Sequence, residues 1–499
     1  MLKLDFTQKG LAPPKKRLSD KNKHENNDLK RECKNDNKPP ASESTLVEQV
    51  VSGIAGLIES RQLPVGRKLP SIRAFATANG ISKSTVVEAF DRLVAQGLLI
   101  SRHKVGFFVA GPRPVLDLTA NTPPAKRDTD PMWVLRNTLM PQHGGLQPGC
   151  GWLPEDWLNG AGLRRALRAV ARSPSAQLTR YGHSLGFAPL RAQLQIVLAG
   201  RGVEVPPGRI IITDSTTQAI DMIGRLLLQP GDKVFVDDPG YYNFLASLRV
   251  HNVQVIGVPF RQDGPDTESF ASLAAKHKPR LYLTNATLHN PTGATLAPAV
   301  AHRLLKIAEA HDIAIVEDDI YADFEEHPTP RLAAMDQLNR VIYTGSFSKT
   351  LSAASRCGWI AARQEWIEGL TDLRLATIVS NNELAAQVLH RLLTDGNYRK
   401  HVEGLRDRLR AASVRVRRQL EARGLSLWTE PKGGMFLWAK LPEGFDSLEI
   451  ARRAVADGIA LAPGNVFSVS YSATRFLRFN VTQSDNKRLY DFFSDVLRH

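Results

Sequence analysis

The sequence predicts an α/β fold class with two parts: an N-terminal winged helix-turn-helix, and a larger domain that has a mostly parallel central sheet and a smaller C-terminal subdomain. Three observations support this prediction. The 499 residues exceed what one compact core usually absorbs. Residues 42–110 follow the order helix, helix-turn-helix, hairpin. Beyond them, short β-branched runs alternate with helical stretches, which is typical of strands joined by crossover helices.

The N-terminal domain is expected to contain three helices and a hairpin. Apolar residues recur at helical spacing from Leu46 to Ile58, and Pro64 breaks that helix. Ser71 and Ser82 can each cap a following helix, because a serine hydroxyl can accept a backbone N–H of the first turn. The expected elements are helices over 46–58, 71–76 and 82–96, and strands over 98–101 and 107–110.

The larger domain is predicted from six buried-type strands with helices between them, for example over 218–228 and 298–311. The strand candidates are 210–213, 233–236, 253–258, 280–284, 313–316 and 341–344. The expected division of the chain is a disordered basic extension over 1–41, the winged helix over 42–110, a proline-rich linker over 111–131, and the larger domain over 132–499, with a large subdomain of about 150–365 and a small one of about 366–499.

The charge of the chain points to a polyanion partner. Residues 1–110 hold 19 Lys and Arg against 11 Asp and Glu, so they carry +8 of the formal net charge of +15. Such a basic N-terminal part favours binding to a nucleic acid. The alternative is a solvated basic tail with no partner.

Composition excludes several other classes of protein. No apolar run approaches the roughly 20 residues that span a bilayer, and residues 1–10 lack the apolar core of a secretory signal. Cys33, Cys150 and Cys357 lie far apart with no CxxC spacing, so neither a disulfide framework nor a metal site is expected. We therefore expect a cytoplasmic protein.

The helix over 82–96 is the candidate recognition helix for double-stranded DNA. Its first turn offers short hydroxyls and a cation that can reach phosphates or base edges, while its apolar face packs inward. A cation of the preceding helix and two at the hairpin tip can contact the DNA backbone. The alternative is a three-helix module that binds protein. The candidate DNA contacts are Arg73, Ser82, Lys83, Ser84, Thr85, Arg102 and Lys104.

About 65 residues of this region resemble the DNA-binding domain of the GntR family of bacterial regulators. The shared motifs are L-P-S-x-R, S-x-S-T-V, L-x-x-x-G-L and the ending G-F-F-V. The usual Gly-x-Gly of the wing tip is replaced by Lys104-Val105-Gly106, which affects the wing contact.

A second set of residues meets the demands of pyridoxal phosphate, which needs a lysine, an acid at the pyridine nitrogen, a donor to the phenolic oxygen, a stacking ring and an anion cradle. Lys349 follows the strand candidate over 341–344, and Asp318 ends the one over 313–316. Tyr321 and Asn290 can donate to the phenolic oxygen. Each residue alone has a commonplace explanation, such as a surface charge, a cap or a turn. Their occurrence together, in this order, indicates a cofactor site.

The remaining demands concern the ring and the phosphate. Tyr241, in Pro-Gly-Tyr, can stack on the cofactor ring. Residues 213–218 join a strand to a helix, whose first N–H groups and hydroxyls can bind phosphate. Arg356 supplies a cation seven residues after Lys349.

Roughly 370 residues resemble the fold-type I aminotransferases, through S-F-S-K-T-L, H-N-P-T-G, D-x-x-Y, G-G-M-F and the run from Tyr181 to Arg191. The resemblance implies that Lys349 forms the internal aldimine and is the catalytic residue, that Asp318 pairs with the pyridine nitrogen, and that Arg478 grips a substrate carboxylate. The family usually has Gly at the position of Ser215 and Pro-Gly at Ala353-Ala354; neither change removes a side-chain ligand, and both can alter loop geometry and cofactor affinity. The implied cofactor contacts are Lys349, Asp318, Tyr321, Asn290, Tyr241, Ser215, Thr216, Ser346, Arg356 and, from a partner subunit of a homodimer, Tyr181.

The fusion of both parts resembles the MocR subfamily of GntR-type transcriptional regulators. The resemblance implies a regulator that uses pyridoxal phosphate, binds a DNA operator as a dimer, and senses an amino compound or the cofactor through the aldimine on Lys349. One alternative is a working aminotransferase with an attached DNA-binding domain. Another is a DNA-binding scaffold whose cofactor site is vestigial.

Overall fold

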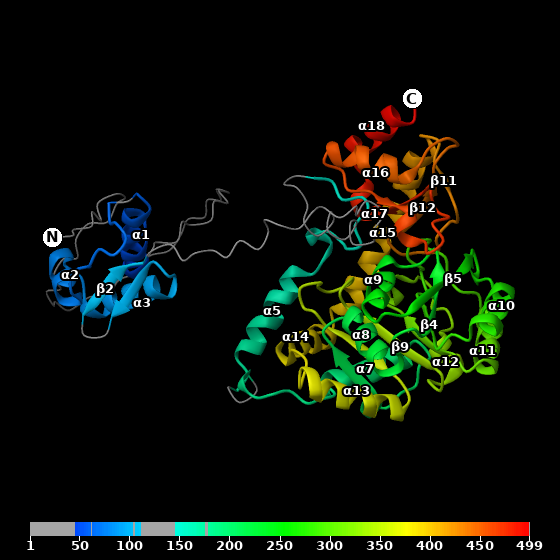
Figure 1. The fold of residues 1–499 in the computed structure, drawn as a ribbon, viewed down its shortest axis with the longest axis horizontal. Coiled ribbons are helices and arrows are strands. Elements are labelled where there is room, and N and C mark those ends of the chain that lie inside the picture. Colours follow the sequence, from blue (N-terminus) through cyan, green and yellow to red (C-terminus); the bar gives the residue numbers. More distant parts are fainter. Residues whose placement is uncertain (1–44, 61, 103–104, 111–144, 175–177, 499) are drawn as a thin grey trace, which may run out of the picture. The chain divides into compact units, whose positions relative to one another are not determined.

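The computed structural model describes residues 45–60, 62–102, 105–110, 145–174 and 178–498. Lys104, the predicted extension over 1–41 and the predicted linker over 111–131 lie outside the described residues. The chain divides into two compact units, residues 1–123 and 124–499, which are described separately below (Figure 1).

The first unit is a winged helix, as the sequence predicts. Thr45 caps α1 with a capping box, in which its hydroxyl and Glu48 each accept a backbone N–H. Ser71 and Ser82 cap the next two helices through their hydroxyls. The second helix runs past its expected end at Ala76 because no residue breaks it before Gly80, which adopts a left-handed conformation. The elements are α1 (Leu46–Glu59), α2 (Ile72–Asn79), α3 (Lys83–Ala95), β1 (Leu99–Arg102) and β2 (Gly106–Val109).

The core of this unit joins the hairpin to the three helices. Phe90 of α3 makes edge-to-face contacts with Phe75 of α2, at 5.4 Å between ring centroids, and with Phe107 of β2, at 5.0 Å. Val50 and Ile54 bring the buried face of α1 to the same cluster. This packing leaves the first turn of α3 exposed at Ser82, Lys83 and Ser84, so that turn is open to a partner.

The second unit contains an eight-stranded sheet among the described residues, in the order β3-β10-β9-β8-β7-β4-β5-β6 (Figure 1). The pairings between β9, β8, β7, β4 and β5 are parallel, which confirms the predicted mostly parallel sheet. The sequence prediction missed β10, which lies antiparallel between β3 and β9. The strands are β3 (Ile210–Thr213), β4 (Lys233–Asp238), β5 (Gln254–Arg261), β6 (Gly264–Pro265), β7 (Leu281–Thr284), β8 (Ala314–Asp318), β9 (Val341–Ser346) and β10 (Gly358–Ala361).

Helices cover both faces of this sheet, because consecutive strand residues point to opposite faces and nearly all of them are apolar. Ile211, Val236 and Ile342 face α8, α9 and α13, whereas Ile212, Phe235 and Val341 face the other helices. The helices on these two faces are α5 (Gly160–Ala171), α7 (Ala188–Ala199), α8 (Thr216–Leu227), α9 (Tyr242–Val250), α10 (Thr267–His277), α11 (Pro298–Ala310), α12 (Leu332–Asp336), α13 (Gln364–Thr377) and α14 (Glu383–Thr394). The short 3-10 turns of this part of the chain are η1 (Glu155–Trp157), η2 (Pro207–Arg209) and η3 (Ala322–Phe324).

A smaller antiparallel sheet, in the order β11-β12-β14-β13, forms the C-terminal subdomain. Leu146, which precedes the large sheet in the chain, joins this subdomain by exchanging backbone hydrogen bonds with Gly458 and Ala460. Because α13 and α14 pack into the cores of the large sheet, we propose that the small subdomain begins near Tyr398 and not at residue 366. Its elements are α15 (Tyr398–Glu421), β11 (Ser426–Leu427), β12 (Phe436–Lys440), α16 (Ser447–Ala456), β13 (Ala462–Pro463), η4 (Gly464–Phe467), β14 (Phe476–Asn480), α17 (Val481–Ser484) and α18 (Lys487–Val496).

Among the described residues, no helix is both long enough and apolar enough to cross a bilayer.

Candidate cofactor and carboxylate site

The predicted cofactor residues lie at one edge of the large sheet. Parallel strands end at the same edge, so loops distant in sequence meet there. Asp318 is the last residue of β8, Ser346 is the last residue of β9, and Lys349 follows it by three positions. Asn290 and Tyr241 come from the loops after β7 and β4. The topology therefore explains why residues spread over more than a hundred positions can serve one site.

Asp318 is buried and Lys349 is partly buried, and the two titratable groups influence each other. Burial and, second to it, the Arg478 cation together lower the pKa of the Lys349 amine to about 8. Burial and, second to it, the neighbouring Asp319 carboxylate together raise the pKa of the Asp318 carboxyl to about 8. Both pKa shifts show that the protein disfavours the charged form of each group. A ligand of complementary charge or reactivity would therefore stabilise each group.

A chain of polar contacts links Tyr321 to Arg478. The Asn290 side-chain amide donates to the Tyr321 hydroxyl at 3.3 Å, and Arg478 Nη1 donates to the Asn290 carbonyl oxygen at 2.7 Å. Asn285, which the sequence prediction missed, fixes this arrangement. Its amide nitrogen donates to the backbone carbonyl of Asp318 at 2.6 Å, and its carbonyl oxygen accepts the Asn290 N–H at 2.9 Å. An asparagine just after a buried strand was the available signal.

Arg478 is fully buried on β14 without a carboxylate partner among the described residues. Its other donor, Nη2, reaches the Gly149 carbonyl at 2.6 Å, and its Nε has no hydrogen-bond partner there. The rings of Phe436 and Phe467 lie 4.4 and 4.9 Å from the guanidinium carbon. A buried cation that is held only by neutral groups is suited to bind an anionic ligand.

A strap over residues 149–152, also missed from the sequence, runs past both cations. Lys349 Nζ donates to the Gly151 carbonyl at 2.6 Å, while Gly149 accepts from Arg478. A Cβ atom at Gly151 would stand 4.0 Å from both Lys349 Nζ and Arg478 Nη2, so glycine leaves space beside the two cations. Asn480 holds the strap by donating to the Trp152 carbonyl at 2.8 Å.

The predicted phosphate residues differ in their availability. Ser215 caps α8, since its hydroxyl accepts the Gln218 N–H at 3.0 Å. The Thr216 hydroxyl is buried and has no hydrogen-bond partner among the described residues, which fits an anion at this helix N-terminus. The Ser346 hydroxyl already contacts the Cys357 carbonyl and Ser348. Ser348, 2.7 Å from Ser346 between hydroxyl oxygens, is a polar residue of this loop that the prediction passed over.

The two predicted tyrosines lie in contrasting environments. Tyr241 makes edge-to-face contacts with Tyr242 and Phe244, and burial holds the pKa of its phenol well above the usual range. Tyr181 is 87% exposed, so its ring has little contact within its own chain. Arg356 is also exposed, and its backbone has φ of 40°, an uncommon conformation for a residue other than glycine. Tyr181 and Arg356 are therefore accessible from outside the subunit.

The predicted DNA-contact residues of the first unit also differ in their exposure and in their contacts within the chain. Arg73 and Lys83 are exposed. The Ser82 hydroxyl accepts the Thr85 N–H at 3.0 Å and lies 2.7 Å from the Ser84 hydroxyl, so its main role within the chain is to cap α3. Arg102 lies over the Phe108 ring, with 4.7 Å between the guanidinium carbon and the ring centroid, which orients this cation on the hairpin.

Comparison with known families assigns both units. Residues 155–493 match the family described as aminotransferase class I and II, and residues 46–109 match the bacterial regulatory proteins of the gntR family. The chain belongs to the class I and II aminotransferases. Its gntR-type N-terminal domain gives it the architecture of the MocR-type regulators.

Individual relatives fall into two groups. The probable rhizopine catabolism regulatory protein MocR of Rhizobium meliloti is 28% identical, over 83% of this chain and 85% of that protein. The aromatic-amino-acid aminotransferase 1 of Thermococcus litoralis is 31% identical, over 64% of this chain and 80% of that protein. A solved structure of the alpha-aminoadipate aminotransferase LysN of Thermus thermophilus, complexed with N-(5'-phosphopyridoxyl)-L-leucine, is 25% identical with a TM-score of 0.67, covering 73% of this chain and 93% of that one.

Proposed function

We propose that this protein is a DNA-binding transcriptional regulator that depends on pyridoxal phosphate and senses an amino compound, or the cofactor itself, through the Lys349 amine. One observation carries the proposal: one chain holds an exposed recognition-helix start and a site with a partly buried lysine, a buried acid and a buried arginine that has no carboxylate partner among the described residues. The MocR relative aligns over 83% of the chain, whereas the aminotransferase relative aligns over 64% of it.

The residues at the sheet edge fit pyridoxal phosphate. When bound, this cofactor supplies an electron sink next to an amine-bearing carbon. The Lys349 amine would hold its aldehyde, and the Asp318 carboxylate would accept the pyridine N–H. Tyr321 and Asn290 would donate to the phenolic oxygen, and Tyr241 would lie against the ring. The phosphate would be held by the free Thr216 hydroxyl and the Arg356 cation, with Ser215 and Ser346.

Arg478 defines the class of effector. A carboxylate can replace the Gly149 carbonyl as acceptor for Nη2 and can also take the unpartnered Nε, which gives a two-point contact. A Cβ atom at Gly151 would lie 4.0 Å from Lys349 Nζ and 4.0 Å from Arg478 Nη2. The two nitrogens are therefore close enough for one small molecule to contact both. The effector is therefore a compound with an amine and a carboxylate, as in an amino acid.

A homodimer is part of the proposal. Tyr181 exposes 87% of its surface, which is unusual for a large aromatic side chain and is consistent with contact to a second copy. Two winged helices in one dimer would read two half-sites of an operator. Binding of the effector would change the relative populations of dimer arrangements that fit those half-sites.

Gel-shift titration tests the regulator. The probe is a duplex from upstream of the protein's own gene, with a scrambled duplex as control, at two salt concentrations. We expect sequence-specific binding whose affinity changes when an amino acid from a panel is added to the cofactor-loaded protein. Lys349→Ala should remove that response, while Lys276→Ala, an exposed lysine on α10, should keep it. Equal, salt-sensitive binding to both duplexes, or a response that survives in Lys349→Ala, contradicts the proposal.

A second candidate function is that of a working aminotransferase. It is favoured by the presence of Lys349, Asp318 and Arg478 in one cluster, because these would supply the base, the ring partner and the carboxylate grip. Single-turnover spectra with a panel of amino acids test it. Conversion of the cofactor to its amine form by at least one amino acid supports this function, and no conversion by any of them excludes it for that panel.

A further inference from the structure

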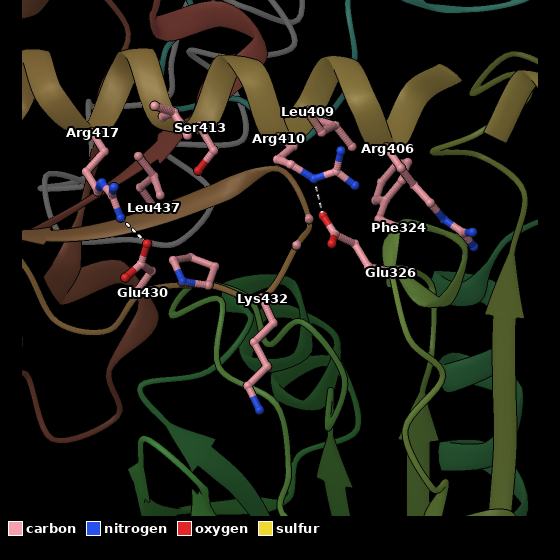
Figure 2. A pocket seen from close by; sticks show the side chains of 14 residues that line it. Phe324, Glu326, Arg406, Leu409, Arg410, Ser413, Arg417, Glu430, Lys432 and Leu437 are labelled. Atoms are coloured by element: carbon pink, nitrogen blue, oxygen red, sulfur yellow. Dashed lines mark hydrogen bonds and ion pairs between the residues drawn. The ribbon is translucent and has the colours of Figure 1, made fainter. Parts of the chain in front are cut away.

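A cavity of about 460 Å³ lies outside the cofactor site, beneath helix α15 (Figure 2). One wall is a face of α15 with residues at helical spacing. The second wall is the loop over 430–434 that leads into β12, and the third is the chain at the end of η3. The lining residues are Phe324, Glu326, Arg406, Leu409, Arg410, Ser413, Val414, Arg417, residues 430–434, and Leu437.

This cavity, which we call the hinge pocket, has walls from both subdomains of the second unit. Arg410 of α15 pairs with Glu326 of the η3 segment at 2.7 Å, and Arg406 Nε donates to the Asp323 carbonyl at 2.8 Å. A backbone bridge between Glu325 and Gly433 joins the same two parts. A ligand in the hinge pocket would therefore touch the large and the small subdomain at once.

The charge of the hinge pocket is positive. Four cationic side chains line it against two acidic ones, and the acids are already paired, Glu326 with Arg410 and Glu430 with Arg417 (Figure 2). Arg406 and Lys432 have no ion pair with any described residue. The two terminal nitrogens of Arg406 also have no hydrogen-bond acceptor there. Arg406 thus offers a guanidinium fork to an anion, whereas the exposed Lys432 side chain points away from α15 (Figure 2).

Apolar side chains complete the walls. Leu409, Leu437 and Phe324 are buried residues that line the hinge pocket. Phe324 stacks on Tyr321, with 6.4 Å between centroids and 27° between planes, so one side chain separates the hinge pocket from the cofactor site. The volume lies within the range of about 300 to 1,000 Å³ of small-molecule sites.

We propose that the hinge pocket binds a small organic carboxylate with an apolar body, and that the bound anion couples the two subdomains. The carboxylate contacts Arg406, and the apolar body lies against Leu409 and Phe324. This site is distinct from the one at Arg478, because it is lined by different residues, and the Phe324 ring of its wall stacks on Tyr321 of the cofactor site.

Calorimetric titration of the full chain loaded with pyridoxal phosphate tests this proposal. The probe is phenylacetate, and benzyl alcohol is the uncharged control. All variants carry Arg478→Met, so the probe cannot bind at that arginine. We expect phenylacetate to bind this background, and Arg406→Met to weaken the binding by about tenfold or more, the usual effect of losing a charged hydrogen bond. Arg399→Met, on the same helix but 91% exposed, should leave the affinity unchanged.

A second variant reduces the volume of the hinge pocket without changing its charge. Ser413→Phe, on the α15 wall, should fill the hinge pocket and abolish phenylacetate binding, with the near-ultraviolet circular dichroism unchanged. Bound phenylacetate should also slow amide hydrogen exchange in both residues 322–326 and 430–434. The proposal is overturned if the Arg478→Met background does not bind phenylacetate, if Arg406→Met and Arg399→Met bind it equally, or if benzyl alcohol binds as well as phenylacetate.

Discussion

Among the described residues of the second unit, Arg331, Arg374 and Arg478 are fully buried, and of these Arg331 and Arg478 have opposite surroundings. Arg331 Nε donates to Asp319 at 2.8 Å, and its Nη2 pairs with Glu325. The Asp319 carboxylate also accepts from the Tyr343 hydroxyl. Arg478 contacts the Asn290 amide oxygen and the Gly149 carbonyl, and no carboxylate among the described residues. Both side chains are 1% exposed or less, so burial does not distinguish them.

From this difference we predict that the Arg331 charge contributes to stability and that the Arg478 charge binds a ligand. The network around Arg331 is closed, because each charge has a partner of opposite sign. The surroundings of Arg478 are open, since no described residue supplies a counter-charge to its cation or an acceptor to its Nε. A buried charge without a counter-charge costs stability, and such costs are retained mainly at functional sites. Substitutions at the two arginines should therefore have different consequences.

The largest effect is expected from Arg331→Met. It would leave Asp319 and Glu325 buried without their cation, which costs about 3 to 5 kcal/mol. The measurement is urea denaturation of the full chain, followed by tryptophan fluorescence. Arg225→Met, which removes a half-exposed pair with Asp221, is the control and should cost about 1 kcal/mol or less. Similar midpoints for both variants would mean that the Arg331 network does not hold the fold.

Arg478→Met should have a small effect on stability and a large effect on ligand binding. Loss of an uncompensated buried cation offsets the loss of its two hydrogen bonds, so the unfolding free energy should change by less than about 2 kcal/mol. Binding of amino acids to the cofactor-loaded protein, followed by spectral titration, should weaken by about 10- to 100-fold. Lys at this position should restore part of the affinity. A destabilisation as large as that of Arg331→Met would assign Arg478 to the fold and not to a ligand.

The smallest effect concerns the pH dependence of the reaction between the Lys349 amine and the cofactor aldehyde. Only the neutral amine attacks an aldehyde, so with a pKa of about 8 the rate of covalent cofactor capture should rise about tenfold per pH unit below 8 and level off above it. Because the Arg478 cation helps to lower this pKa, Arg478→Met should move the midpoint to higher pH. Stopped-flow absorbance measures the rate. An unchanged midpoint in Arg478→Met would show that the two cations do not interact.

Much of this molecule follows from local patterns in the sequence. Ser71 and Ser82 cap helices as predicted, because a cap depends on residues within one turn. Strand β3 matches its predicted bounds, since a buried apolar run between turns is a local signal. Strand β10 was missed, because Gly358–Ala361 becomes a strand through pairing with β3 and β9, and no nearby residue marks it.

The sequence by itself determined the two domain types and the residue types of the site: a lysine, an acid, a tyrosine, an asparagine and an arginine at matching motifs. The tertiary structure alone decided how they interact. It brought Arg478 of β14 to Asn290 across 188 positions, and Gly151 to Lys349 across 198 positions. It also decided that Arg331 is neutralised while Arg478 is not. The physical reason is that pairing and burial depend on packing between distant segments, which local patterns do not encode.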